Sequence, residues 1–263
     1  MTARVASVNV GRPRPVDTGR RVVGTAIWKR PVAGRVAVRG VNVDGDDQAD
    51  RTVHGGPDKA VYAYALEEIR QWEHELGRPL GAAAFGENLT TEGIDVSGAL
   101  VGERWRIGTT LLEVVQPRLP CFKLGLRMGD PTFLKRFAES SRPGAYLRIV
   151  AEGELGAGDA IEVDLAALPD HGVSMRLLSD ALLLDERAPD ALALAVLGDG
   201  QRQQLHPARR VHELDVTDDP AVVHRDQDAA PAEVRGEPLR RVLGEREELT
   251  QLVTRPAVLA DLH

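Results

Sequence analysis

The chain has 263 residues, which is enough for one or two domains. Hydrophobic residues make up 43% of it and charged residues 28%, which excludes a wholly disordered, fibrous or disulfide-scaffold protein. Its 33 Lys and Arg against 40 Asp and Glu give a net charge of −7, and no apolar run reaches membrane length, so neither a nucleic acid nor a membrane is an expected partner.

Short β-branched and apolar segments separated by turn residues predict a β-rich first part of the chain. The expected strands cover residues 5–10, 22–28, 35–39, 60–64, 105–107, 111–115, 146–150 and 160–163. Helical spacing predicts one helix from Leu66 to a stop at Gly77, and another over residues 132–140 with Phe133 and Phe137 on one face. Many short strands between turns indicate a barrel or rolled sheet, so the expected fold class is mostly β with α.

The composition changes at about residue 165. All ten aromatic residues lie within the first 146 residues. Residues 1–165 carry 22 basic and 22 acidic side chains, whereas residues 166–263 carry 11 and 18. We therefore expect the main core in the first part, a short helical region over 166–209, and an acidic, partly disordered tail over 210–263. Within these later regions the expected helices are 175–184, 190–197 and 240–253, and the expected linker is 226–238.

Two clusters of polar residues surround glycine and proline. Residues 48–59, which include His54 and Lys59, are too polar and too rich in turn residues to be core. Residues 85–90 place Glu87 and Asn88 between apolar residues. The first cluster is either a plain surface loop or a functional one. The second is either an ordinary turn or a way to present a carboxylate and an amide to a pocket.

A third cluster, residues 116–124, contains the only cysteine, Cys121. Two prolines stiffen this segment, and Arg118 and Lys123 would favour the thiolate, the form that binds metals. The alternative is an inert, packed thiol. A single cysteine excludes an internal disulfide and supplies one sulfur ligand, so a transition metal here would need most of its ligands from elsewhere, for example from an organic cofactor.

In order and spacing, these clusters resemble the MOSC domain, named for the C-terminal domain of molybdenum cofactor sulfurase, and most closely its YiiM-like branch. The resemblance covers residues 4–165. Its six motifs are Ser7-Val8-Asn9-Val10-Gly11, Gly45-Asp46-Asp47-Gln48-Ala49-Asp50, His54-Gly55-Gly56-Pro57-Asp58-Lys59-Ala60-Val61, Phe85-Gly86-Glu87-Asn88-Leu89-Thr90, Gln116-Pro117-Arg118-Leu119-Pro120-Cys121-Phe122-Lys123-Leu124 and Arg142-Pro143-Gly144. Residues 171–174 resemble the start of the small three-helix domain that follows MOSC in this branch.

The resemblance implies a β-rich, barrel-like domain that binds the molybdenum cofactor, a molybdenum ion held by the dithiolene of molybdopterin. In the family, the cysteine of the Pro-Cys motif coordinates molybdenum. The site residues implied here are Cys121 as metal ligand and catalytic residue, His54 and Glu87 as catalytic residues in proton delivery or hydrogen bonding, and Lys59, Asn88 and Arg118 as cofactor-binding residues.

The YiiM-like branch is linked to the reduction of N-hydroxylated compounds, including hydroxylaminopurine-type bases and amidoximes. The resemblance therefore implies a cytoplasmic, molybdenum-dependent oxidoreductase that detoxifies such small molecules. Nothing in the sequence resembles a flavin or nicotinamide site, so the electrons would come from a separate flavin or NAD(P)H reductase. Two alternatives use the same residues: a non-catalytic carrier of the cofactor or of sulfur, and a scaffold whose motifs only maintain the fold.

Overall fold

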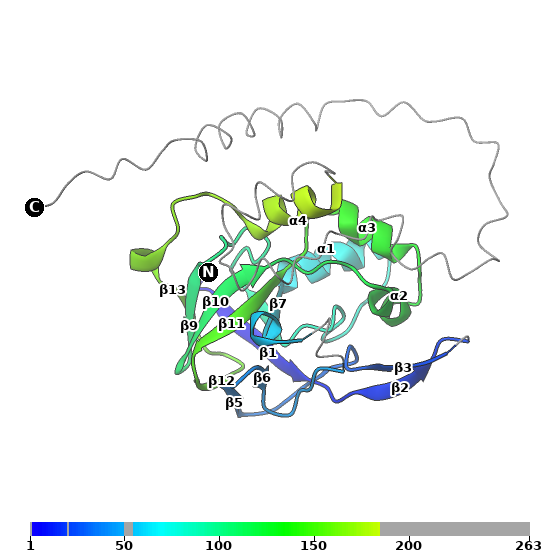
Figure 1. Ribbon diagram of the computed structural model, residues 1–263, viewed down its shortest axis with the longest axis horizontal. Helices are drawn as coiled ribbons and strands as arrows, with labels where there is room; N and C mark the ends of the chain where they lie inside the picture. Colours follow the sequence, from blue (N-terminus) through cyan, green and yellow to red (C-terminus); the bar gives the residue numbers. More distant parts are fainter. Residues whose placement is uncertain (1, 20, 50–54, 185–263) are drawn as a thin grey trace, which may run out of the picture. The chain divides into compact units, whose positions relative to one another are not determined.

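The computed structural model describes residues 2–19, 21–49 and 55–184 (Figure 1). These ranges are mostly β with four α-helices, as the sequence predicts. The acidic tail, its linker and the helices expected over 190–197 and 240–253 lie outside the described residues. None of the helices in the described ranges has the length and apolar character needed to cross a membrane.

Thirteen strands form three sheets in the described part of the chain. The eight-stranded sheet has the order β13-β9-β10-β11-β7-β8-β1-β4, and smaller sheets have the orders β12-β5-β6 and β2-β3. The strands are β1 (Arg4–Val10), β2 (Arg14–Asp17), β3 (Val22–Thr25), β4 (Arg30–Pro31), β5 (Arg35–Arg39), β6 (Asn42–Val43), β7 (Val61–Ala65), β8 (Leu89–Glu92), β9 (Arg104–Ile107), β10 (Thr110–Gln116), β11 (Ala145–Ala151), β12 (Gly153–Gly156) and β13 (Ile161–Val163). The helices are α1 (Leu66–Leu76), α2 (Phe122–Met128), α3 (Phe133–Glu139), α4 (Met175–Leu184) and the 3-10 turns η1 (Pro57–Lys59) and η2 (Leu165–Ala167).

The large sheet curls until its two ends meet. Strand β7 runs parallel to β8, and α1 lies in the connection between them. At the other side, Val5 N donates to Asp159 O at 2.9 Å, and a β-bridge joins Arg4 to Ala160, just before β13. Strand β1 thereby contacts the far edge of its own sheet. The barrel-like architecture that the short strands predict is confirmed.

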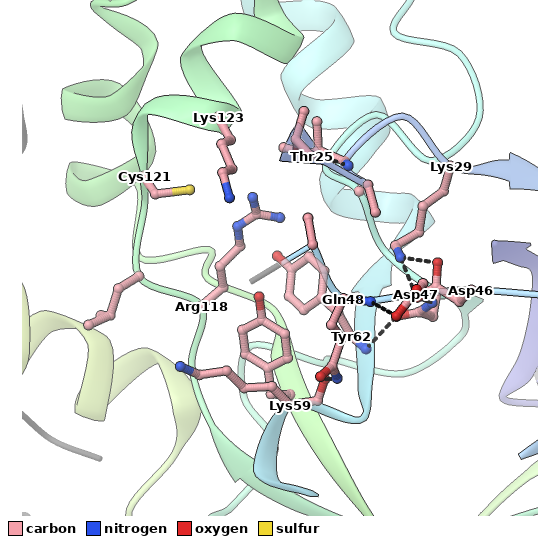
Figure 2. A pocket seen from close by; sticks show the side chains of 17 residues that line it. Thr25, Lys29, Asp46, Asp47, Gln48, Lys59, Tyr62, Arg118, Cys121 and Lys123 are labelled. Carbon is pink, nitrogen blue, oxygen red and sulfur yellow. Dashed lines mark hydrogen bonds and ion pairs between the residues drawn. The ribbon is translucent and has the colours of Figure 1, made fainter. Parts of the chain in front are cut away.

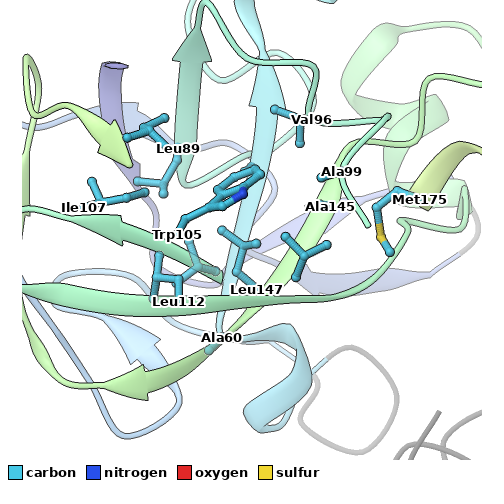
Figure 3. Close-up of a cluster of buried hydrophobic side chains, with 14 of the residues drawn as sticks. Ala60, Leu89, Val96, Ala99, Trp105, Ile107, Leu112, Ala145, Leu147 and Met175 are labelled. Atoms are coloured by element: carbon cyan, nitrogen blue, oxygen red, sulfur yellow. The ribbon is translucent and has the colours of Figure 1, made fainter. Parts of the chain in front are cut away.

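The interior of this curled sheet is apolar. Trp105, Leu112 and Leu147, from three neighbouring strands, are completely buried there (Figure 3). Met175, the first residue of α4, is buried in the same cluster. The main core therefore lies in the aromatic-containing part of the chain, and α4 also packs on it.

A second, aromatic cluster lies between the sheet and the helices. Phe133 and Phe137 of α3 are both buried in it, which confirms that they share one face of that helix. Trp72 of α1 completes the contact, and its Nε1 donates to the Tyr64 hydroxyl on β7 at 2.9 Å. This cluster fixes the helices on the sheet next to the segments that form the candidate site.

Several elements differ from the sequence prediction. The strand expected over residues 22–28 ends at Thr25, and the elements that the sequence did not predict are β2, β4, β6, β8, β12 and α2. Helix α2 forms in a segment that reads as a loop, because its apolar residues alternate with polar or small ones and Gly125 lies at its centre. A Cβ atom at Gly125 would lie 3.3 Å from Pro131 Cα, so the glycine allows α2 to pack closely against the loop that joins it to α3. Strand β8 forms directly after the predicted turn at Glu87, because it pairs with the distant β1 and β7.

Candidate functional site

A pocket of about 120 Å³, here called the thiol pocket, opens where several loops meet (Figure 2). The loops after β3, β6 and β10 contribute to it, together with η1 and the loop before β8. Its polar lining residues are Thr25, Lys29, Asp46, Asp47, Gln48, Lys59, Tyr62, Asn88, Arg118, Cys121, Lys123 and Tyr146. Four of the six site residues that the sequence implies are therefore brought together: Lys59, Asn88, Arg118 and Cys121.

The thiol of Cys121 is held at the boundary between a proline-stiffened loop and a helix. Cys121 is the N-cap residue of α2, with an extended backbone, and its carbonyl accepts from Leu124 N at 2.8 Å. The side chain is partly buried. Figure 2 shows its sulfur pointing toward the Lys123 amine and the Arg118 guanidinium. The thiol is thus fixed in a cationic part of the pocket.

Arg118 is a buried cation, with 6% of its surface exposed. One of its guanidinium nitrogens donates to the Phe85 carbonyl, and the guanidinium lies 5.0 Å from the centroid of the Tyr62 ring. No carboxylate forms an ion pair with it in the ranges that the structure describes. A buried charge without a counter-charge is costly. The arrangement therefore indicates an anionic ligand in this pocket.

Lys59 is presented by the short turn η1, which is held at both sides. Inside the turn, the buried Asp58 forms an ion pair with Arg148 at 2.6 Å. Outside it, Gln48 Nε2 donates to the Lys59 carbonyl at 3.1 Å, and Gln48 Oε1 accepts from Gly56 N at 3.1 Å. These contacts fix the backbone from which the Lys59 side chain reaches the pocket.

Asn88 lines the pocket, and its amide group is engaged with the protein. The Oδ1 atom accepts from Tyr62 N at 3.1 Å, and Nδ2 donates to Asn9 O at 3.2 Å and to Asp46 Oδ2 at 2.9 Å. Both amide hydrogens are therefore used in holding three segments together. Cofactor binding by Asn88 stays a prediction beside this organising role.

Lys29 and Asp46 form a buried ion pair in the pocket wall, and no local pattern predicts this pair. Burial lowers the pKa of Lys29, and the Asp46 carboxylate opposes this shift. Asp46 Oδ1 also accepts from Gly11 N at 2.8 Å. The sequence around Lys29 contains no motif that would identify it as a site residue. Asp46 belongs to one of the family motifs, but no role is predicted for it.

Glu87 is completely buried and lies behind the pocket wall, since it is not among the lining residues. Its Oε2 accepts from Phe85 N at 3.0 Å, and its Oε1 accepts from the Thr90 hydroxyl at 2.9 Å. Burial raises the pKa of Glu87 to about 7. Because Phe85 in turn holds Arg118, Glu87 fixes the backbone that positions this arginine. The catalytic roles of Glu87 and of His54, which lies outside the described residues, stay predictions.

Two tyrosines that the sequence did not indicate also line the pocket. Tyr62 and Tyr146 pack with their rings tilted and the ring centroids 4.9 Å apart, and the Tyr62 hydroxyl donates to Pro143 O at 2.8 Å. Burial raises the pKa of Tyr146, so its hydroxyl stays protonated at neutral pH. Tyr62 lies on β7 and Tyr146 on β11, which pair with each other. The alternation of side chains along a strand does not show which face of the sheet lines a pocket.

The described residues include no group of three or more His, Cys, Asp or Glu side chains that could hold a metal ion by themselves. Because the chain has one cysteine, any further sulfur ligand of a metal at Cys121 would come from a cofactor. The pocket brings one thiol together with two lysines and a buried arginine that has no ion-pair partner among the described residues, and this set fits an anionic, sulfur-bearing cofactor such as molybdopterin. This donor set agrees with the expected cofactor.

The comparisons with known proteins identify the class. The model of the MOSC domain family matches residues 50–162. The chain is 37% identical over 172 residues to the uncharacterized protein YflK of Bacillus subtilis (strain 168), covering 65% of this chain and 77% of YflK. The chain belongs to the MOSC domain family.

Two further relatives define its place more closely. The crystal structure of YiiM from Geobacillus stearothermophilus has a TM-score of 0.56 and 30% identity, covering 78% of this chain and 92% of YiiM. A protein of Gibberella moniliformis (strain M3125 / FGSC 7600) named "Reductase" is 32% identical over 59% of this chain. The match covers 28% of that longer protein. The YiiM-like resemblance is thereby confirmed.

Proposed function

We propose that this protein is a molybdenum-cofactor-dependent oxidoreductase that reduces N-hydroxylated small molecules, such as hydroxylaminopurine-type bases and amidoximes. A separate flavin or NAD(P)H reductase would supply the electrons. The observation that carries the proposal is the thiol of Cys121 in one pocket with Arg118, a buried cation that forms no ion pair within the described ranges. The membership in the MOSC family and the relative named "Reductase" support it.

The residues of the thiol pocket would hold the cofactor both at its metal and at the anionic groups of its pterin. The thiolate of Cys121 would bind the metal, and Arg118, Lys59 and Lys123 would bind the anionic groups of the pterin. When bound, the cofactor would supply the two-electron redox chemistry and the remaining sulfur ligands. The protein would orient the cofactor and exclude other ligands by the charge of the pocket.

The proposed reaction breaks the N–O bond of an N-hydroxyl group, consumes two electrons and two protons, and releases the amine and water. Tyr146, whose hydroxyl stays protonated in the pocket, can donate a hydrogen bond to the substrate oxygen. We keep His54 as the proposed proton donor. We assign Glu87 a positioning role through Phe85 and Arg118, because its carboxyl group lies behind the pocket wall.

The test is turnover of 6-N-hydroxylaminopurine by the full chain, purified from a host that makes the cofactor, with reduced methyl viologen as electron donor. We expect the wild type to form adenine, Cys121→Ser to lose this activity, and the exposed-site control Lys135→Ala to retain it. Bound molybdenum without reduction of any N-hydroxylated substrate would contradict the proposed enzymatic activity and favour a carrier of the cofactor. Equal activity of wild type and Cys121→Ser would contradict the assigned site.

A further inference from the structure

A second cavity, of about 630 Å³, lies beside the thiol pocket and shares the Lys29 side chain with it. We call it the arginine cleft, after the residues that dominate its lining: Arg12, Arg14, Trp28, Lys29, Arg30 and Arg127. No Asp or Glu is among the described residues that line it. In Figure 1, the β2–β3 hairpin extends on the same side of the sheet as α2, and these elements supply Arg14 and Arg127.

Apart from Lys29, which pairs with Asp46, the cations of the arginine cleft form no ion pair with an acidic side chain among the described residues. Arg12 and Arg14 are exposed, and neither forms an ion pair in the part of the chain that the structure describes. The Arg14 guanidinium instead lies 4.5 Å from the ring centroid of Trp28, a cation–π contact. This contact holds the guanidinium in place without neutralising its charge.

Arg127 is only partly satisfied. Its Nε atom is buried and has no hydrogen-bond acceptor within the described ranges, and its Nη2 reaches Ala82 O only at 3.4 Å. Burial lowers the pKa of Arg127; the Glu87 carboxylate opposes this shift, and the charges of Arg14 and Arg78 add to it. Like charges thus converge on a buried donor that lacks an acceptor, which is costly unless an anion enters.

We propose that the arginine cleft binds the phosphate or pyrophosphate group of a small ligand of the nucleoside diphosphate kind. The planar guanidinium fork matches two phosphate oxygens at once, and several arginines around one cavity favour a multiply charged group. The volume of the cleft lies within the range of small-molecule sites. The inference does not rest on the proposed redox function, because Cys121 and Arg118 do not line the cleft.

The phosphate could belong to a free nucleotide or to a ligand whose other end occupies the thiol pocket, and the experiment separates these sources. Titration calorimetry at low salt would use the full chain with inorganic pyrophosphate, ADP and adenosine as probes. Each titration would be repeated with Arg12→Ala/Arg14→Ala, Arg127→Met and Lys123→Ala. The matched control is Arg106→Ala, an exposed arginine on β9 that lies outside the lining of the cleft.

We expect pyrophosphate and ADP to bind at a site that survives Lys123→Ala, with adenosine at least roughly tenfold weaker. Arg12→Ala/Arg14→Ala, at exposed positions, should weaken this site at least roughly tenfold, and Arg106→Ala should not. Two charge-assisted hydrogen bonds between arginine and phosphate typically account for a tenfold difference in affinity. If ADP binds the cleft more tightly than pyrophosphate, the natural ligand is a free nucleotide. If the two affinities are equal, the cleft binds only the phosphate groups of its ligand.

Three results would overturn the proposal. The first is no binding of pyrophosphate or ADP to the wild type. The second is binding that Lys123→Ala abolishes and the arginine variants leave intact, since the anion then lies in the thiol pocket. The third is an equal loss with Arg106→Ala, or tighter binding of a 12-nucleotide DNA strand than of ADP, because both show attraction to general positive charge. A loss of molybdenum in Cys121→Ala would leave the proposal unaffected.

Discussion

The side-chain amide of Asn88 donates a 2.9 Å hydrogen bond to the Asp46 carboxylate and so joins the loop before β8 to the loop after β6. Asp46 also accepts from Gly11 N and pairs with Lys29. One buried carboxylate therefore holds three other segments in the wall of the thiol pocket. Three residues of the family motifs, Asn88, Asp46 and Gly11, therefore help to determine the shape of the pocket.

We expect Asn88→Ala to lower the free energy of unfolding by about 3 kcal/mol, because three buried partners lose their hydrogen bonds at once. Urea unfolding followed by circular dichroism measures this. Asn42→Ala, whose amide donates to the Asp46 carbonyl at the partly buried edge of the same loop, is the matched control and should cost about 1 kcal/mol. Equal costs for the two variants would show that Asn88 has no special organising role.

Removal of the Lys29 charge alone should lower the free energy of unfolding more than removal of both charges of the Lys29–Asp46 pair. We expect Lys29→Met to cost about 3 kcal/mol in stability, because it leaves the Asp46 carboxylate buried without its cation. The double variant Lys29→Met/Asp46→Asn should be less destabilised than the sum of the two single variants. A double-mutant cycle from thermal and urea unfolding gives this coupling energy, and strict additivity would contradict the interpretation.

Glu87 should make stability depend on pH. The pKa of its buried carboxyl is about 7, above the ordinary value of 4.5, so the folded state keeps a proton that the unfolded state has lost between these values. The contribution of Glu87 to stability is therefore full below about pH 4.5 and falls as the pH rises to about 7, by at most about 1.4 kcal/mol per pH unit.

Glu87→Gln removes this titration while it retains a hydrogen-bonding side chain. The stability of the variant relative to wild type should therefore increase between pH 5 and pH 7. Glu68, whose pKa burial also raises to about 7, is present in both proteins and cancels in the difference. The control Glu139→Gln, at an exposed position of α3 beside Lys135, measures the effect of removing a surface carboxylate. If the stability difference between Glu87→Gln and wild type does not change with pH, the raised pKa of Glu87 is refuted.

Lys123 should matter for retention of the cofactor. Its amine lies next to the Cys121 sulfur in the thiol pocket (Figure 2), so Lys123→Ala removes positive charge where the anionic pterin would bind. We expect the molybdenum content after dialysis at high salt to fall several-fold in this variant, because screening weakens the remaining contacts. Lys135→Ala, on the exposed face of α3, should behave as wild type. No difference between the variants would exclude a role for Lys123.

The sequence predicts most strands of this fold, because the alternation of apolar residues is a local signal. The strand over residues 35–39 and the helix from Leu66 to Leu76 agree with the structure residue by residue. Strand β8 and helix α2 are not predicted. The first depends on pairing with strands far along the chain, and the second is short and interrupted by glycine.

The candidate site divides in a similar way. Cys121, Arg118 and Lys59 can be found because they lie in polar segments rich in glycine and proline, which seldom belong to a core. Lys29 and Tyr146 cannot, because neither belongs to such a polar segment: Lys29 directly follows an apolar run and Tyr146 begins one, and only the fold brings both to the pocket. The arginine cleft likewise combines residues from β2, β4 and α2, which no local pattern brings together.

The most direct test of the central claim is the molybdenum content of wild type and Cys121→Ala, expressed side by side in a host that makes the cofactor. We expect near-stoichiometric molybdenum in the wild type and a content lower by roughly tenfold or more in Cys121→Ala, because the variant lacks the one protein sulfur ligand. Thermal unfolding confirms that both proteins are folded. Wild-type protein without molybdenum, or equal contents in the two proteins, would contradict the assignment of Cys121 as the metal ligand.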